Sequence, residues 1–108
     1  MELSVAGGID RTVVAVNGNL DVATAGELRE SLHHAIGDAG TSLIVDLTGV
    51  WFLDSTALGV LVGVHKRLLE RGGGLQLVCP RDGLLRIFRL TGLDRVFAIH
   101  ASLTAVPA

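Results

Sequence analysis

The chain has 108 residues, a length typical of one domain with a single modest core, so we expect one domain over residues 1–108. About half of its residues are apolar, and charges of both signs are scattered to a formal net charge of −2. This balance excludes the strongly basic surface of a nucleic-acid-binding protein. A single cysteine, Cys79, excludes an intrachain disulfide and a cysteine-rich zinc site.

Strand and helix patterns alternate along the chain. An edge strand comes first, and a β-branched second strand is expected to end at Gly18-Asn19. Asp21 and Asp82 are expected to cap the first and third helices, and residues 101–106 form a weak helix at best. Strands are predicted at 1–6, 12–17, 42–47, 74–79 and 95–100, and helices at 23–38, 55–71 and 82–90.

This order predicts an α/β fold with a mostly parallel sheet of four to five strands and right-handed crossovers. The strand at 42–47 is apolar on one face and mixed on the other, where Ser42 and Asp46 lie. A sheet covered equally on both faces would be apolar on both. We therefore expect the helices mainly on one face.

The most informative feature is the run Asp54-Ser55-Thr56, which precedes a long apolar helix. All three residue types accept hydrogen bonds from the free N–H groups of a helix start, although one cap would suffice. The polar excess suggests a site. Ser55 is expected to be exposed at the positive end of the helix dipole, where added negative charge is tolerated.

The same helix carries a stripe of small residues, Thr56, Gly59 and Gly63. A glycine inside a helix costs about 1 kcal/mol relative to alanine, so it is kept where another backbone comes close. Two interpretations remain open. The stripe packs against a neighbouring element of the domain, or it is an exposed docking face for a partner.

Catalytic and metal chemistry find little support. Ser55 lacks the G-x-S-x-G context of a hydrolase nucleophile, and His65 lies nearly three turns along the same helix, too far to activate it. His33 and His34 are adjacent, so they point about 100° apart and do not share a metal. We expect no catalytic residue, no metal and no cofactor, and His65 and Cys79 as packed core residues.

Two stretches resemble the STAS family, and within it the bacterial anti-sigma factor antagonists. Residues 18–25, GNLDVATA, are similar to the family's G-E-L-D-x-x-T-A segment. Residues 52–61, FLDSTALGVL, are similar to its D-S-[ST]-G-L-G-V-L signature, and residues 90–97, LTGLDRVF, also fit. The resemblance implies a STAS-type βα superhelix.

The resemblance also implies a switch protein rather than an enzyme. In such proteins the unphosphorylated form binds an anti-sigma factor that is a serine kinase, and so frees the sigma factor. The kinase then phosphorylates the serine that falls on Ser55, the complex dissociates, and a phosphatase resets it. The partner-binding residues would be Asp21, Thr24, Asp54, Ser55, Thr56, Gly59, Val60 and Gly63. The alternative is a docking subunit of a transporter or signalling scaffold that is never phosphorylated.

Three departures from the family pattern stand out: Asn19 replaces an acidic residue, Ala57 replaces a frequent glycine, and residues 101–108 are short and uncharged. None of them removes the phosphoacceptor. The first residues lack a basic and an apolar signal region, and no uncharged run is long enough to span a bilayer. We therefore expect a cytoplasmic protein without membrane insertion, monomeric or weakly dimeric.

Overall fold

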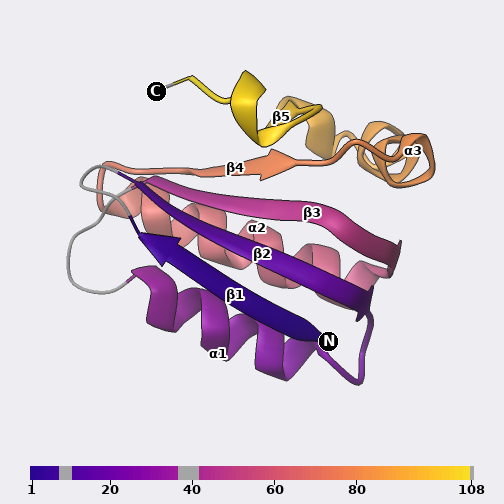
Figure 1. The fold of residues 1–108 in the computed structure, drawn as a ribbon, viewed down its shortest axis with the longest axis horizontal. Helices are drawn as coiled ribbons and strands as arrows, with labels where there is room; N and C mark the ends of the chain where they lie inside the picture. Colours follow the sequence, from indigo (N-terminus) through magenta and orange to yellow (C-terminus); the bar gives the residue numbers. More distant parts are fainter. Residues whose placement is uncertain (8–10, 37–41, 108) are drawn as a thin grey trace.

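The computed structural model describes residues 1–7, 11–36 and 42–107 of the chain (Figure 1). Within them, strands and helices follow one another in the predicted order. The strands are β1 (Glu2–Gly7), β2 (Arg11–Leu20), β3 (Ser42–Leu53), β4 (Leu75–Val78) and β5 (Ala98–His100). The helices are α1 (Ala25–Ile36), α2 (Ser55–Glu70) and α3 (Asp82–Leu90), with short 3-10 turns η1 (Leu93–Arg95) and η2 (Leu103–Ala105).

The five strands form one sheet in the order β1-β2-β3-β4-β5. β1 runs antiparallel to β2, and every later neighbour is parallel. This sequential order arises because each parallel pair is joined by a helix that crosses back over the same face. The predicted mostly parallel α/β sheet is confirmed.

The predicted ends of the second and third strands were wrong, and the difference positions the site. β2 does not stop at Gly18 but continues to Leu20, and its partner β3 continues to Leu53. The pairing shifts register between Ala15 and Asn17 and again after Gly18, whose φ is +106°. Gly18 adopts the positive φ that this irregularity requires, and the two strands pair again beyond it.

Smaller differences lie at other element ends. α1 begins at Ala25 rather than at residue 23, and the predicted helix end at residues 37–38 lies outside the described residues. β5 begins at Ala98 because the preceding residues form η1, and residues 101–106 hold only η2. Asp82 was expected to be a cap but is the first helical residue, after an N-cap residue, Arg81, whose side chain makes no capping bond.

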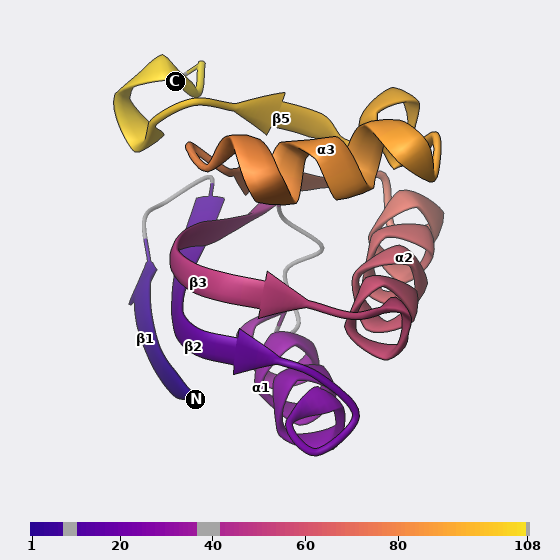
Figure 2. The same ribbon diagram turned by 90° about the vertical axis from the view of Figure 1, so that its right-hand side faces the viewer.

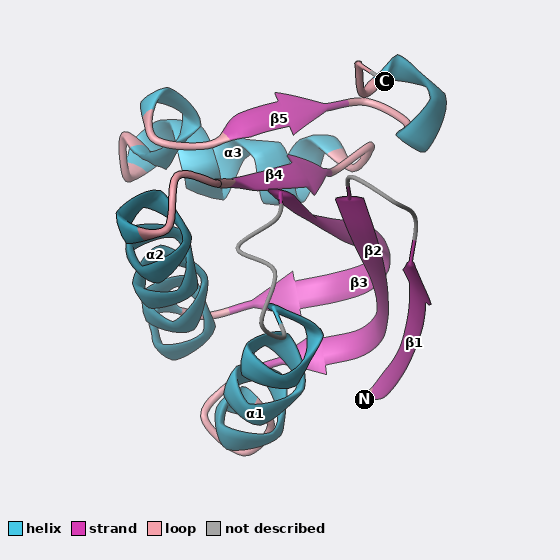
Figure 3. Cartoon of the chain, turned by 90° about the vertical axis from the view of Figure 1, so that its left-hand side faces the viewer, coloured by secondary structure: helices cyan, strands magenta, loops and turns pink. Residues whose placement is uncertain are grey.

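The main core lies between the sheet and the helices, as predicted for helices mainly on one face. Figures 2 and 3 show α1 and α2 on the same side of β2 and β3. Fully buried side chains of this core include Leu28, Leu32, Leu61, Leu68 and Phe88, from all three helices.

The opposite face of the sheet has a smaller cluster. Ile44 and Val78 are buried there beneath Val106, which follows η2 near the end of the chain. Arg11 holds this segment by donating a hydrogen bond from Nη1 to the carbonyl of Pro107 (3.1 Å). The C-terminal segment therefore covers Ile44 and Val78, a part of the face that the helices leave open.

Within the described ranges, none of the helices has the length and apolar character needed to cross a membrane.

Candidate functional site

Asp54 joins the ends of two strands to the starts of two helices. It is the N-cap of α2, where its Oδ1 accepts a hydrogen bond from the N–H of Ala57 (3.0 Å). Its Oδ2 accepts from the N–H of Val22 (3.0 Å), in the turn before α1. Its own N–H donates to the carbonyl of Leu20, at the end of β2 (3.0 Å). Of the three residues expected to be able to cap this helix, Asp54 does so, and it also fixes the neighbouring turn.

Asp21 and Thr24 build that neighbouring turn. Oδ1 of Asp21 accepts from the N–H groups of Ala23 (3.0 Å) and Thr24 (3.2 Å). Oγ1 of Thr24 accepts from the N–H of Asp21 and donates to the carbonyl of Asn19, each at 3.0 Å. Both side chains are half-buried. Their hydrogen bonds stabilise the turn that leads into α1. The capping-type hydrogen bonds expected of Asp21 are present, but they lie in the turn that precedes α1, which begins at Ala25.

Ser55 and Thr56 are the first two residues of α2, and both are exposed. In the described part of the chain, neither hydroxyl has a hydrogen-bond partner. Because Asp54 already caps the helix, neither hydroxyl is required for capping. Ser55 therefore presents an unengaged hydroxyl beside the free N–H groups of a helix N-terminus.

Gly59 and Gly63 lie on the exposed side of α2. A Cβ atom added at either position would meet no described atom within 4 Å. Close packing inside the domain, one of the two interpretations of the small-residue stripe, is therefore wrong for these glycines. Val60 differs, because only 3% of it is exposed and it packs into the main core.

These glycines form the floor of a groove between α1 and α2, which pack side by side (Figure 2). We call it the α1–α2 groove. Its volume is about 370 Å³, and its lining includes three arginine or lysine residues and one histidine. The lining consists of Arg29, His33, Gly59, Val60, Gly63, Val64, Lys66, Arg67 and Glu70.

Three exposed apolar side chains near Ser55 were missed by the sequence analysis. Val22 is 74% exposed, Trp51 67% and Phe52 51%. The guanidinium of Arg81 stacks over the Trp51 ring at 3.8 Å, which holds the ring in place. Two adjacent aromatic residues in a chain with four in total were the available signal. Exposed aromatic side chains beside a polar site are typical of protein interfaces.

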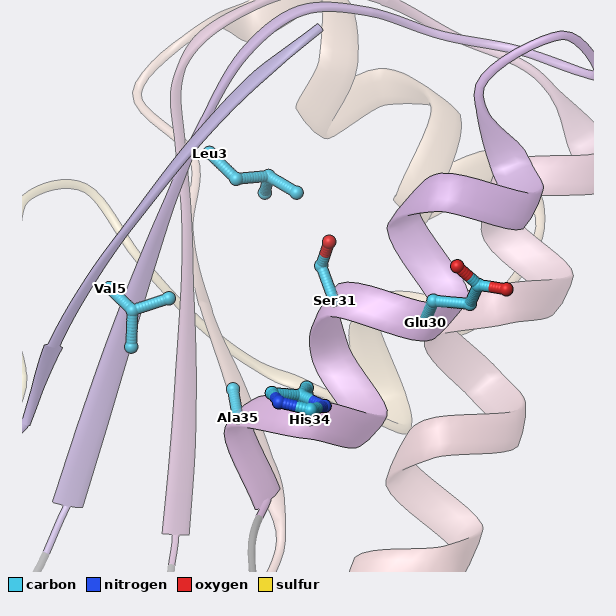
Figure 4. A pocket seen from close by; sticks show the side chains of 6 residues that line it. All are labelled: Leu3, Val5, Glu30, Ser31, His34 and Ala35. Carbon is cyan, nitrogen blue, oxygen red and sulfur yellow. The ribbon is translucent and has the colours of Figure 1, made fainter.

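A second pocket, of about 460 Å³, lies between β1 and the other side of α1. Figure 4 shows Leu3 and Val5 of β1 facing Ser31 and Ala35 of α1 across it. It contains none of the predicted site residues and lies apart from Ser55.

His65 and Cys79 are buried or hydrogen-bonded away from Ser55. Nδ1 of His65 accepts a hydrogen bond from the N–H of Leu75 (3.0 Å), and its ring packs edge-on against Phe97 at 5.1 Å. Burial lowers the pKa of His65 and raises that of Cys79, which is a buried free thiol. Among the described residues, His, Cys, Asp and Glu nowhere gather in a group of three that would bind a metal.

Comparison with known proteins places this geometry in a family. The STAS domain model matches residues 1–106. The anti-sigma-B factor antagonist of Listeria monocytogenes is 39% identical over 90 residues, covering 83% of this chain and 79% of that protein. The protein of the same name from Bacillus subtilis is 39% identical over 88 residues, covering 82% and 80%.

A solved structure gives the same result. The crystal structure of an anti-sigma factor antagonist from Mycobacterium paratuberculosis superposes with a TM-score of 0.85 at 29% identity, covering 95% of this chain and 87% of that one. The chain belongs to the STAS domain family, and its relatives there include anti-sigma-B factor antagonists.

Proposed function

We propose that this chain is an anti-sigma factor antagonist switched by phosphorylation of Ser55. In its unphosphorylated form it binds an anti-sigma factor that is also a serine kinase, and so releases the sigma factor. Phosphate on Ser55 ends the binding, and a phosphatase restores it. The protein acts as a regulated binding partner and not as an enzyme. The observation that carries this proposal is the exposed, unengaged hydroxyl of Ser55 at the N-terminus of α2.

Ser55 lies where a phosphate can be added without unfolding the domain. A phosphoserine adds a charge of roughly −1.5 to −2 at neutral pH. The helix N-terminus stabilises that charge, whereas the neighbouring Asp54 carboxylate repels it. A partner that packs over Ser55 must desolvate the new charge, so binding is weakened more than folding. Switches of this kind typically have couplings of about 1–3 kcal/mol.

The docking surface extends on both sides of Ser55. On one side lies the turn of Asp21 and Thr24, with the exposed side chain of Val22. On the other lie Thr56, Gly59 and Gly63 along α2, with the buried Val60 beneath them. Phe52 adds an apolar contact immediately before the cap residue Asp54. Such a mixture of apolar contacts and one modifiable hydroxyl suits reversible protein binding.

The test mixes the purified chain with the anti-sigma factor kinases encoded in the same genome, with Mg-ATP, and reads intact mass and complex size. Ser55→Ala is the matched control. We expect one phosphate on the parent, mapped to Ser55, and loss of the complex only for the parent. Binding without phosphate transfer would instead support a docking subunit that is never phosphorylated. Absence of both binding and transfer would contradict the proposal.

A further inference from the structure

The α1–α2 groove carries a positive charge that the described part of the chain does not neutralise. Arg29 on α1 and Lys66 and Arg67 on α2 line it, against one carboxylate, Glu70. None of these four side chains forms an ion pair within the described residues. The groove is thus basic on a chain whose formal net charge is −2. An acidic occupant would gain attraction here without displacing an internal partner.

The floor of this groove accepts a close backbone. Gly59 and Gly63 have no side chain and no described neighbour within 4 Å of an added Cβ. Each costs helix stability, and the domain's own packing does not explain that cost. Helices that approach one another closely commonly meet at such small residues, which allow short distances between the two axes.

An α-helix is the conformation that suits the occupant of this groove best. The backbone groups of α1 and α2 are already bonded within each helix, so the groove offers no ladder for an extended strand. A helix satisfies its own backbone and presents side chains in both directions. Its carboxylates would face Arg29, Lys66 and Arg67, while its small residues lie against the glycines.

On α2 the groove begins at Gly59, one helical turn after Ser55. Ser55, Gly59, Gly63 and Arg67 are all exposed and follow each other at intervals of four along α2, so each lies next to the following one on the helix surface. Twelve residues of helix separate Ser55 from Arg67 by about 18 Å. A phosphate on Ser55 is therefore too far away to neutralise the basic end of the groove.

We propose that the docking surface around Ser55 extends along α2 into the α1–α2 groove, and that the groove receives an acidic helix of the same partner. This rests on the proposed function, because it assigns both sites to one partner. The Ser55 end and the basic end of this surface have different roles. The Ser55 end makes binding conditional on phosphorylation, and the basic end supplies affinity and selects partners that carry carboxylates.

The groove is tested first without the partner. The probe is a stapled helical alanine peptide with glutamates along one face, and the control is the same peptide with lysines. Amide NMR signals are followed during titration. We expect the glutamate peptide to shift the signals of Gly59 and Gly63, and the lysine peptide to leave them in place. Absent shifts at these glycines, or equal shifts with both peptides, would overturn the proposal.

Charge reversal supplies the matched variants. Lys66→Glu with Arg67→Glu should weaken peptide binding about tenfold at low salt, since each change removes an attraction and adds a repulsion. The loss should shrink as salt rises. Arg86→Glu with Arg89→Glu, on the exposed side of α3, should change it by less than about twofold. Lys66→Gln with Arg67→Gln should give an intermediate loss of peptide affinity. This neutral pair is the control for a folding defect caused by charge reversal. Equal losses for both reversed pairs would overturn the assignment to this groove.

The affinity of the same variants for the cognate kinase is measured next. Reversal at Lys66 and Arg67 should weaken that complex while leaving phosphate transfer to Ser55 detectable at high concentration. Unchanged affinity for the kinase would overturn the groove proposal and leave the proposed function intact. Glutamate-peptide binding in the groove, together with failure of every kinase to bind, would overturn the proposed function and, with it, the assignment of the groove to that partner.

Discussion

The carboxylate of Asp54 accepts a hydrogen bond from the backbone N–H of Val22, at 3.0 Å from Oδ2. These residues are 32 positions apart in the chain. The bond ties the turn before α1 to the start of α2, while the other oxygen of Asp54 caps α2 itself. Ser55 is thereby placed beside the turn that Asp21 and Thr24 build, so that one partner surface would touch both segments.

Removing this carboxylate should destabilise the protein. Asp54→Ala deletes the helix cap and leaves the N–H of Val22 without its acceptor, so we expect a loss of about 1–2 kcal/mol in unfolding free energy. Urea unfolding followed by circular dichroism measures it. Ser55→Ala is the control, because its hydroxyl has no partner in the described residues and its loss should change stability little. Equal stability of both variants would show that Asp54 is dispensable as a cap.

Ser55→Asp should separate binding from folding. The added carboxylate lies at a helix N-terminus, which tolerates negative charge, so the melting temperature should stay near that of the parent. Partner affinity should fall about 5–150-fold, measured by calorimetry against the anti-sigma factor. A variant that fails to fold would instead identify Ser55 as a structural residue.

Filling the groove floor should block binding without harming the fold. Gly63→Leu adds a side chain where no described atom lies within 4 Å of the new Cβ. Replacing a helical glycine should raise helix stability by up to about 1 kcal/mol. We expect higher thermal stability together with lost partner binding, and the same for Gly59→Leu.

Gly83→Leu is the matched control for these two variants. Gly83 is also helical, exposed and free of described neighbours, but it lies on α3, away from the groove. It should gain stability and keep partner binding. Retained affinity in the Gly59 and Gly63 variants would remove this face of α2 from the interface.

His65 should make stability depend on pH below neutrality. Burial lowers its pKa in the folded state, and only the neutral ring accepts the hydrogen bond from Leu75. As pH falls below about 6.5, the unfolded state binds the proton more readily than the folded state, so the unfolding free energy decreases. His65→Asn keeps an acceptor without a titrating ring. Urea unfolding between pH 5 and pH 7.5 should show a steeper loss for the parent, and parallel curves would contradict this.

The C-terminal segment should contribute to stability through Val106. This side chain is 6% exposed and covers Ile44 and Val78 on the open face of the sheet. Val106→Ala removes buried methyl groups, so we expect a loss of about 1.5 kcal/mol. Leu103→Ala, in the same segment but 38% exposed, should cost less. Similar losses in the two variants would contradict a specific role for Val106.

Local patterns predicted the element order well because they depend on near neighbours in the chain. The spacing of apolar residues located the first helix, and the three possible caps at residues 54–56 marked the start of the second. The same reasoning failed at Gly18 and Asp82. Local reasoning predicted that the strand ends at Gly18. In the structure β2 continues beyond Gly18 because it pairs with β3. At Asp82, helix α3 begins one residue earlier than the best capping side chain would place it.

The sequence by itself determined the βα order, the family signature around Ser55 and the unusual polar run at the start of α2. Only the tertiary structure decided whether Gly59 and Gly63 face the core or an open groove, because that depends on how α1 and α2 pack. It also decided that Arg29 and Arg67, on different helices, line one groove, and that Asp54 reaches Val22. Periodicity along the chain records which side of a helix is apolar. The distance between two segments is set by the packing of the whole domain.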